Sequence, residues 1–340
     1  MKIDIFSLDL PDLETYVISL GHPRFRAHQI FQWIHEKGIF RVEEMSNLPL
    51  SLRDELAPVF SPFPLRLDEI LYGDDGTRKL RYLLADGGCV ESVWIPEEKR
   101  STLCISTQLG CRMGCLFCRT GQMGWKRNLE TGEILGQVHA VRKQLGPEKP
   151  VSHIVFMGMG EPLDNLDNSL CALRILTNPT GGGFSTRRIT VSTVGIPQGM
   201  DRLLREVPVS ITVSLNASDE KTRSKLMPVN RRYPLDELCN SLRVLPLAPR
   251  RRITIAYVLI GGMNDRPGDA VRLVRLLHGI RCKVNLIPLN PFPGSDLARP
   301  EPSVAVAFQE TLRSKGISTH IRYSRGDDIL AACGQLAEKS

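Results

Sequence analysis

Two periodicities separate an N-terminal helical part from a strand-rich part. Apolar residues at three-to-four spacing between Phe25 and Ile34 predict an amphipathic helix within residues 1–60. Residues 65–100 instead carry short apolar runs separated by Gly and Asp turns, which is typical of a β-meander. A proline-rich stretch at 58–64 lies between the two parts, so we expect a junction there.

From residue 100 onward, short β-rich runs alternate with helical patterns, which indicates βα units around a parallel sheet. The expected strands are 103–106, 153–157, 189–192, 209–215, 252–260, 283–288 and 317–322. The expected helices are 131–144, 165–177, 197–206, 219–226, 234–245, 267–278 and 303–315. Six or more such units predict an open or closed α/β barrel with its active site at the C-terminal ends of the strands.

These changes of pattern define four segments. We expect a helical module over residues 1–60 and a β-meander that links it to the barrel over residues 61–100. The barrel should occupy residues 101–322, and a short C-terminal tail should follow over residues 323–340.

Composition and charge narrow the class of protein. Hydrophobic residues at 42% and charged residues at 24% are typical of a globular chain. The longest apolar stretch, near Ile253, is too short to span a bilayer, and the acidic N-terminus disfavours a signal peptide, so we expect a cytoplasmic protein. The net charge is +7, and its basic excess lies entirely in residues 101–340. This asymmetry favours a polyanionic partner such as RNA, although an ordinary solvated surface remains an alternative.

The strongest chemical signal is a cysteine group directly after the first expected barrel strand. Cys111, Cys115 and Cys118 have C-x3-C-x2-C spacing, which favours metal ligation over a disulfide in an intracellular chain. Zinc requires a fourth ligand, and the neighbours His139 and Cys104 lie on an expected helix and an expected strand. Three thiolates suit a [4Fe–4S] cluster with one iron open to a ligand. Structural zinc and unliganded core thiols are the alternatives.

This motif at the mouth of an α/β barrel resembles the radical S-adenosylmethionine (SAM) superfamily, in which the open iron binds SAM. Further blocks are similar to the RlmN/Cfr family of RNA adenine methyltransferases: VESV, TLCISTQLGC, GCLFCRTG, FMGMGEPL, ITVSTVG, VSLNAS, RSKLMPVN, VNLIPLNPFPG and RGDDILAACGQL. The resemblance runs from about Val90 to Leu336. It implies a radical SAM partial (βα)6-type barrel with a small N-terminal helical module and a β-meander extension.

The resemblance also implies a SAM site at the strand ends. Its residues would be Gly160, Glu161, Ser192, Ser214, Leu215, Asn216 and Asn290. Glycines such as Gly160 permit close approach of a ligand, and the Glu161 carboxylate can accept from the SAM ammonium, although a strand-end turn is the alternative. Many family members have His where this chain has Asn216. An amide still donates and accepts, so we expect a changed ribose contact and retained activity.

The resemblance also implies that two cysteines outside the cluster motif act in separate steps of the methyl transfer. One SAM methylates a C-terminal cysteine, here Cys333, and a second SAM supplies a 5′-deoxyadenosyl radical that removes a hydrogen from that methyl group. The carbon then adds to the adenine ring and links protein to RNA. Cys104 matches the thiol that releases this adduct by forming a disulfide, and Glu91 matches the family's proton acceptor; whether Glu91 or Cys104 takes the ring proton stays open. By residue type alone, ordinary core or surface thiols and a solvated Glu on a half-exposed strand are the alternatives.

The implied function is a radical SAM methyltransferase that uses two SAM per turnover and methylates C2 of an adenine in 23S rRNA, with tRNA as a second candidate substrate. It would need an external electron donor, and we expect a monomer. A Cfr-type C8 methyltransferase of 23S rRNA and a non-catalytic metal-cluster RNA-binding protein are alternatives.

RNA contacts are expected from two parts of the chain. The helical module could recognise RNA shape by packing and stacking through residues 24–33. The barrel could contribute phosphate contacts through the basic residues Arg119, Lys126, Arg127, Arg187, Arg188, Arg231, Arg232 and Arg250–Arg252.

Overall fold

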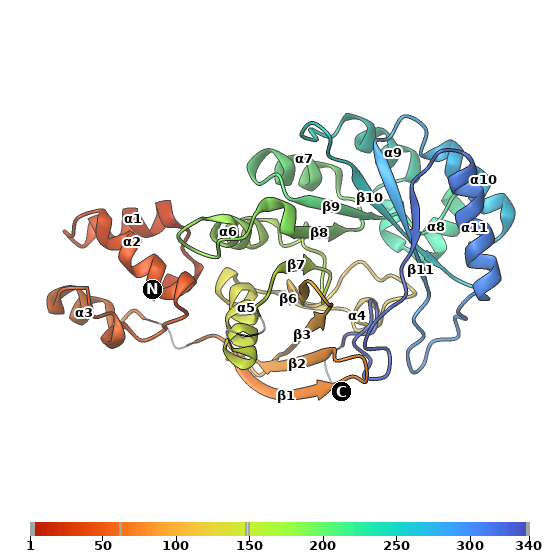
Figure 1. Cartoon of the computed structure of the whole chain (residues 1–340). Helices are drawn as coiled ribbons and strands as arrows, with labels where there is room; N and C mark the ends of the chain where they lie inside the picture. The colour runs from red at the N-terminus through yellow and green to blue at the C-terminus, as the bar shows by residue number, and fades with distance from the viewer. Residues whose placement is uncertain (1–3, 61–62, 147, 149, 338–340) are drawn as a thin grey trace.

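A single mixed sheet organises the molecule. The computed structural model describes residues 4–60, 63–146, 148 and 150–337. Within them, ten strands pair in the order β1-β2-β3-β4-β7-β8-β9-β10-β11-β12 (Figure 1). These strands are β1 Arg66–Tyr72, β2 Arg78–Leu83, β3 Cys89–Pro96, β4 Ser101–Ile105, β7 His153–Phe156, β8 Ile189–Thr193, β9 Ser210–Ser214, β10 Ile253–Leu259, β11 Cys282–Pro288 and β12 Thr319–Ile321. Strands β1 to β4 pair antiparallel, as expected for the meander, and strands β4 to β12 pair parallel, as expected for the barrel.

Helices alternate with the parallel strands along the chain. They are α5 Thr131–Leu145, α6 Leu166–Thr177, α7 Pro197–Glu206, α8 Glu220–Leu226, α9 Leu235–Val244, α10 Pro267–Leu276 and α11 Pro302–Ser314. Helix α7 begins with Pro197, whose fixed φ suits a first turn, and it buries Met200, Leu203 and Leu204 on one face. Strand β10 is apolar and almost continuously buried, as a strand covered on both sides must be. The alternation confirms the predicted partial βα barrel.

The N-terminal module is a group of short helices beside the barrel (Figure 1). Its elements are η1 Ile5–Ser7, α1 Leu10–Ser19, α2 Phe25–Phe31, the π-helical turn η2 Gln32–Glu36, η3 Val42–Glu44 and α3 Leu50–Leu56. The helix predicted from Phe25 onward is therefore present, and it continues as the π-helical turn. The predicted boundary between residues 60 and 61 lies at the edge of the described residues, because 61 and 62 fall outside them.

A small hairpin between β4 and α5 was not predicted from the sequence. It consists of β5 Gln108–Gly110 and β6 Trp125–Asn128, and the short helix α4 Arg119–Gln122 lies between the two strands in sequence. At Gly110, with φ of 69°, an added Cβ would collide with the carbonyl oxygen of Gly124. The hairpin therefore needs glycine there, and it anchors the cysteine loop through a 2.8 Å hydrogen bond from Cys111 N–H to the Gly124 carbonyl.

The C-terminal tail, defined here as residues 323–337, returns from β12 to the meander. Asp75 accepts a hydrogen bond from Gly326 N–H, and Asp328 accepts one from Asp74 N–H. Deeper in, Lys79 Nζ donates to the Leu330 carbonyl at 3.3 Å. The meander thus positions the tail as well as extending the sheet.

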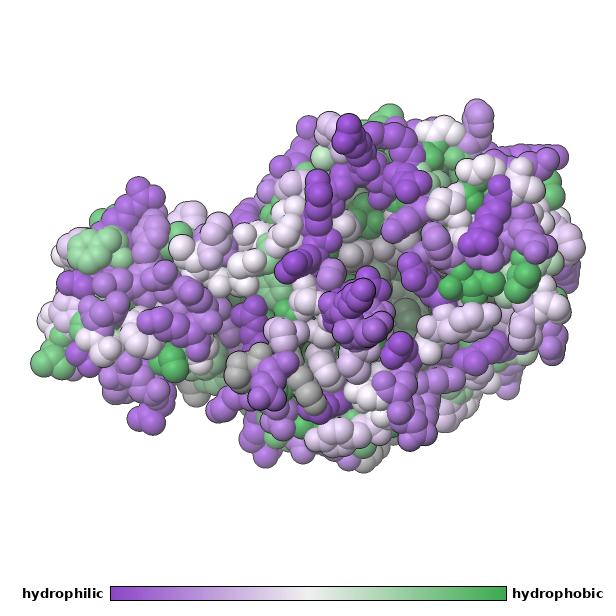
Figure 2. Space-filling view, viewed as in Figure 1, coloured by the Kyte–Doolittle hydropathy of each residue, from purple (hydrophilic) through white to green (hydrophobic). Residues whose placement is uncertain are grey.

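Figure 2 shows a mostly hydrophilic face that is hollowed near its centre. Within the described residues, no helix combines the length and the hydropathy that a membrane span requires.

Candidate active site

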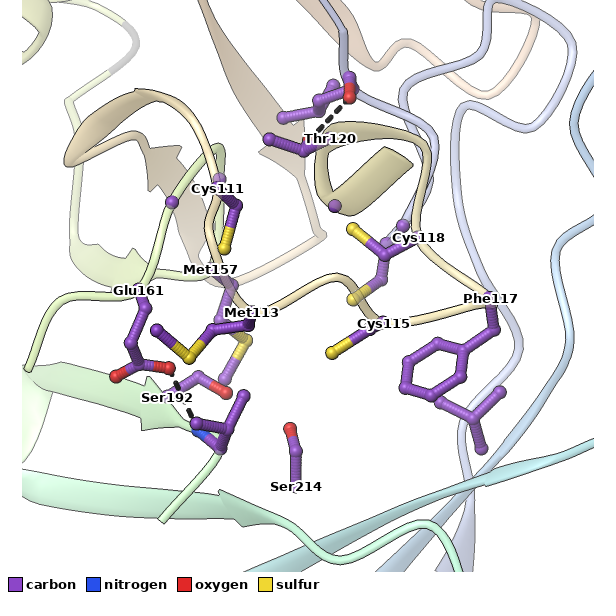
Figure 3. Close-up of a pocket in the computed structure, with 18 of the residues that line it drawn as sticks. Cys111, Met113, Cys115, Phe117, Cys118, Thr120, Met157, Glu161, Ser192 and Ser214 are labelled. Atoms are coloured by element: carbon purple, nitrogen blue, oxygen red, sulfur yellow. Dashed lines mark hydrogen bonds between the residues drawn. The ribbon is translucent and has the colours of Figure 1, made fainter. Parts of the chain in front are cut away.

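One cavity lies at the C-terminal ends of the parallel strands, where the barrel prediction expected the site. It contains about 920 Å³ of empty space, its open mouth included. Nine of the expected site residues line it: Cys111, Cys115, Cys118, Gly160, Glu161, Ser192, Ser214, Asn290 and Cys333. Met113, Phe117 and Met157 add apolar walls that the sequence had not singled out. Figure 3 shows the cysteine loop on one side of the space and Glu161, Ser192 and Ser214 across from it.

The three cysteines of the motif come from one loop that begins after β5 and ends at the start of α4. Burial raises the pKa of Cys111 to about 12 and the pKa of Cys115 well above its usual range, and a bound metal would reverse this by favouring thiolates. No group of three His, Cys, Asp or Glu side chains in the described residues is arranged to hold a single metal ion. An iron–sulfur cluster makes a different demand, because each cysteine binds its own iron. Three thiols around one cavity fit that donor set.

Glu161 is a buried carboxyl group that is already oriented by the backbone. Its two oxygens accept hydrogen bonds from Val194 N–H at 2.9 Å (Figure 3) and from Leu163 N–H at 3.0 Å. Burial nevertheless raises its pKa to about 7. Each carboxylate oxygen can accept more than one hydrogen bond, so the group can still accept from a ligand cation in the cavity.

The glycines before Glu161 are needed for a reason that differs from the expected one. Gly160 has φ of 96°, and a Cβ there would lie 2.5 Å from Gln108 Cβ. At Gly158 a Cβ would lie 2.7 Å from the Ile105 carbonyl oxygen. The prediction that these glycines admit a ligand was therefore incomplete, because they also let two loops of the protein itself approach closely.

Leu215 and Asn216 do not line this cavity, unlike the other residues expected at the SAM site. Leu215 is fully buried in the core. Asn216 adopts φ of 59°, a left-handed conformation that asparagine tolerates better than most residues. Its side chain accepts from Val258 N–H at 2.8 Å and donates to Met227 Sδ at 3.3 Å. The amide thus connects neighbouring loops here, and its contact with the SAM ribose stays a prediction.

Cys333 and Cys104 come together although they are far apart in sequence. Cys333 lines the cavity and is exposed, and the protein atoms packed near its thiol, together with Cys118, raise its pKa to about 11. Cys104, on β4, is buried, and burial together with Cys333 raises its pKa to about 12. All nine cysteines are free thiols in this structure. Cys333 is therefore near enough to influence Cys104 electrostatically.

Glu91 on β3 is only 5% exposed, so the alternative of a solvated residue on a half-exposed strand is wrong. Its carboxylate lies 3.4 Å from Lys79 Nζ and accepts a hydrogen bond from Ala337 N–H at 3.1 Å. Burial raises its pKa although Lys79 and the Ala337 amide act in the opposite direction. Glu91 does not line the cavity; the tail covers it.

Several supporting residues were missed because polar residues in loops have no periodic signal. Gln108 is fully buried and accepts from Glu161 N–H at 2.9 Å, which holds the strand-end turn. Arg223 is also fully buried and donates to the carbonyls of Leu215 and Val194, which joins two strand-end loops behind the cavity. Thr120 donates to the Leu336 carbonyl at 2.6 Å and so attaches the tail to α4 (Figure 3).

One of the expected RNA-contacting cations has a structural role. Arg127 pairs with Glu133 at 2.7 Å and with Asp86 at 2.6 Å. These two carboxylates raise its pKa and occupy its donors. Arg127 therefore links the β5–β6 hairpin to helix α5 through Glu133 and to the meander through Asp86.

The parallel barrel, the three-cysteine loop at its mouth and the strand-end carboxyl group define a radical SAM enzyme. Residues 105–274 match the family model described as the radical SAM superfamily, and residues 3–61 match the ribosomal RNA large subunit methyltransferase N-terminal domain. A radical SAM methyltransferase from Sphaerobacter thermophilus superposes with a TM-score of 0.92 at 43% identity, over 98% of each chain.

Curated relatives narrow the class to a family. The dual-specificity RNA methyltransferase RlmN of Syntrophobacter fumaroxidans is 48% identical over 327 residues, which is 96% of each chain. The protein of the same name from Geobacter sulfurreducens is 48% identical over 99% of this chain and 92% of its own length. The chain belongs to the RlmN family of radical SAM methyltransferases, whose cofactors are a [4Fe–4S] cluster and SAM. The comparison confirms the family and fold predicted from the sequence.

Proposed function

We propose that this protein methylates C2 of an adenine in 23S rRNA and in tRNA, with Cys333 as the methyl carrier. The observation that carries the proposal is the cavity in which Cys333, from the tail, faces Cys111, Cys115 and Cys118 from the motif loop. When bound there, the cluster and SAM supply the radical chemistry that an electron-poor ring carbon requires. The chain itself must bring a methyl-bearing thiol to the same place, which the tail does.

The cavity residues divide into three tasks. Cys111, Cys115 and Cys118 hold the cluster. Glu161, Ser192, Ser214 and Asn290 hold SAM by accepting from its ammonium and donating to its oxygens, and Gly160 forms the turn that presents Glu161. Leu215 and Asn216 lie outside the cavity lining and support the strand-end loops that hold SAM. A direct test is Cys115→Ala, which should lose cluster absorbance and all RNA methylation while the protein stays folded by circular dichroism.

Cys104 and Glu91 act on the protein–RNA adduct. Cys104 lies near Cys333 and can attack the thioether sulfur, which releases methylated RNA and leaves a disulfide. We assign proton removal to Glu91, because a buried carboxylate with a raised pKa is a stronger base than a solvated one. Ala337 N–H occupies one Glu91 oxygen, so proton removal requires that this hydrogen bond open while the carboxylate stays enclosed.

The Cfr-type C8 reaction is the closest competing function, since it would use the same cysteines. Mass spectrometry of nucleosides from 23S rRNA and tRNA incubated with the protein distinguishes the two. We expect 2-methyladenosine in both RNAs. Recovery of 8-methyladenosine alone would overturn the proposal.

A non-catalytic RNA-binding protein is the other alternative. Anaerobic purification followed by metal and sulfide analysis addresses it. We expect a coloured protein with about four irons and four sulfides, as one [4Fe–4S] cluster requires. A colourless protein with one zinc would exclude radical chemistry.

The remaining expectations follow from this function. The helical module up to residue 60 should recognise RNA shape, the meander over 61–100 should support the tail, the barrel over 101–322 should hold the cofactors, and the tail over 323–340 should carry the methyl group. An external reductant for the cluster, a monomeric state and a cytoplasmic location complete the proposal. Size-exclusion chromatography with light scattering tests the oligomeric state.

A further inference from the structure

The turn that carries Cys333 is held by side chains as well as by backbone hydrogen bonds, such as those from Arg119 N–H to the Gly334 carbonyl and from Gln335 N–H to the Ala332 carbonyl. Four of these side chains, those of Asn290, Arg299, Asp327 and Gln335, form a connected polar chain that we call the clasp. It joins the loop after β11, which carries the SAM-side residue Asn290, to the tail. Its members contact the backbone on both sides of Cys333, so the clasp controls where that thiol lies.

Gln335 is the centre of the clasp and is only 1% exposed. Its side-chain oxygen accepts from Ala332 N–H at 3.0 Å, which closes the turn around Cys333. Its side-chain nitrogen donates to the Pro291 carbonyl at 2.8 Å and to Asp327 Oδ1 at 2.7 Å. The amide thus uses its acceptor and one donor within the tail, and its other donor on Pro291 in the loop after β11.

Arg299 and Asn290 continue the connection to the cavity. Asp327 Oδ2 lies 3.0 Å from Arg299 Nη2, which also donates to Asn290 Oδ1 at 3.2 Å. Asn290 Nδ2 donates to the Cys333 carbonyl at 3.1 Å. A residue of the SAM side of the cavity is therefore bonded directly to the methyl-carrying residue.

We propose that Gln335 is a positioning residue that holds Cys333 at the SAM cavity for methylation, and that opening of the clasp lets the methylated thiol shift toward the RNA adenine while it stays within reach of a second SAM. This inference rests on the proposed function. Gln335 touches neither SAM nor RNA; it acts through the backbone of residues 332–335. Hydrogen bonds to a charged partner such as Asp327 are strong, yet they are readily exchanged for water once the turn lifts.

The polar character of the clasp suits a contact that must break and re-form. Asp327 and Arg299 are each nearly half exposed, so water reaches their ion pair without wider unfolding. Gln335 is the buried member, and its side-chain amide is the part of the clasp that bonds directly across the turn to Ala332 N–H. It is therefore the residue to change.

The test uses the full protein with its cluster reconstituted, and mass spectrometry verifies that Cys333 starts unmethylated. Gln335→Glu keeps the size of the side chain and the acceptor for Ala332, but it places a carboxylate against Asp327 and the Pro291 carbonyl. We expect methylation of Cys333 by SAM, followed on the tail peptide, to be at least about tenfold slower, because a hydrogen bond to a charged group is replaced by repulsion. SAM affinity should remain unchanged.

Two further variants separate positioning from general stability. The double variant Gln335→Glu with Asp327→Asn exchanges donor and acceptor in this contact. The amide nitrogen introduced at position 327 can donate to the carboxylate introduced at position 335, while the amide oxygen at position 327 still faces Arg299. We expect this double variant to recover most of the lost Cys333 methylation rate. Gln309→Glu is the matched control: Gln309 on α11 donates to the Thr319 carbonyl, away from the tail, and its change should leave the rate near the wild-type value.

The outcomes also separate this inference from the proposed function. If wild-type protein methylates Cys333 and Gln335→Glu does so at the same rate, the clasp assignment is wrong and the proposed function stands. An equal loss in Gln309→Glu, or no recovery in the double variant, would also refute it, because the loss would then reflect folding. If wild-type protein with an intact cluster and bound SAM never methylates Cys333, the proposed function itself fails.

Discussion

The two ends of the chain contact the barrel in different ways. The N-terminal module docks through buried apolar and aromatic side chains: Phe31 is fully buried and reaches the loop at Gly181, and Phe40 contacts His139 of α5 with ring centroids 5.1 Å apart. The tail docks mainly through hydrogen bonds, such as those of Gln335 and Thr120. Each end thus has the kind of contact that suits its task.

Apolar burial is non-directional and is lost only when a whole surface separates, so it suits a module that stays in place. Hydrogen bonds that can be exchanged for water suit a segment that must leave its site and return. Because Cys333 has to meet SAM and RNA in separate steps, we expect the tail to move and the module to remain docked. The following experiments test that difference, beginning with the largest effect.

Removal of the tail thiol should abolish the reaction. Cys333→Ala eliminates the methyl carrier while the clasp and the cluster cysteines remain, so we expect no methylated RNA and no covalent RNA adduct. Cluster content and SAM binding should be retained. The measurement is nucleoside mass spectrometry together with the iron content of the variant, and RNA methylation at the wild-type rate would exclude Cys333 as the carrier.

Removal of the partner thiol should trap the tail on RNA. Cys104→Ala keeps the carrier but removes the resolving thiol, so a protein–RNA crosslink through Cys333 should accumulate. Denaturing gels of copurified RNA detect it. The double variant that also carries Cys333→Ala should show no crosslink, and a crosslink that persists there would disprove the assigned roles.

Truncation of a buried module residue should reduce stability instead of chemistry. Phe31→Ala should lower the free energy of unfolding by about 3–5 kcal/mol, because it removes a fully buried ring and leaves a cavity. Phe25→Ala, at a side chain that is 53% exposed in the same helix, should change it by less than about 0.5 kcal/mol. Urea unfolding gives both values, and similar losses in the two variants would argue against apolar docking.

Acid should weaken the module contact through its buried histidines. His35 and His139 lie with ring centroids 5.8 Å apart, and burial lowers the pKa of His139 to about 3 and that of His35 well below its usual range. The pKa of histidine in the unfolded chain is about 6.5. Above that pH both histidines are neutral in the folded and in the unfolded chain, so they cause no change of stability with pH there. As the pH falls below about 6.5, these two histidines take up protons in the unfolded chain but stay neutral in the folded chain. Stability should then fall by roughly 1.4 kcal/mol per pH unit for each histidine.

Urea unfolding at pH 7 and pH 5 measures this slope. His35→Phe removes one of the two titrating groups while it keeps an aromatic ring beside Phe31, so the loss between the two pH values should shrink by about half of the histidine contribution. If the free energy of unfolding of His35→Phe falls between pH 7 and pH 5 as much as that of the wild type, His35 does not contribute to the acid sensitivity.

The sequence by itself determined the elements and the metal motif. Helix α7 covers 197–206 as predicted, and both ends of every barrel strand agree with prediction to within two residues. Apolar periodicity is a local property, and it reports which face of an element is buried. The spacing of Cys111, Cys115 and Cys118 is local as well, since eight residues on one loop must stay close together. The β5–β6 hairpin escaped prediction because its strands are too short for a periodic signal.

Only the tertiary structure decided which distant groups meet. The path of the tail places Cys333 beside Cys118 and Cys104, and it brings Ala337 onto Glu91. The structure also showed that Asn216 faces its neighbouring loops rather than the cavity. These contacts join residues separated by many elements, so they depend on strand order and on the return of the tail to the meander. No local pattern records such a path, because it follows from how the whole sheet and its covering helices pack.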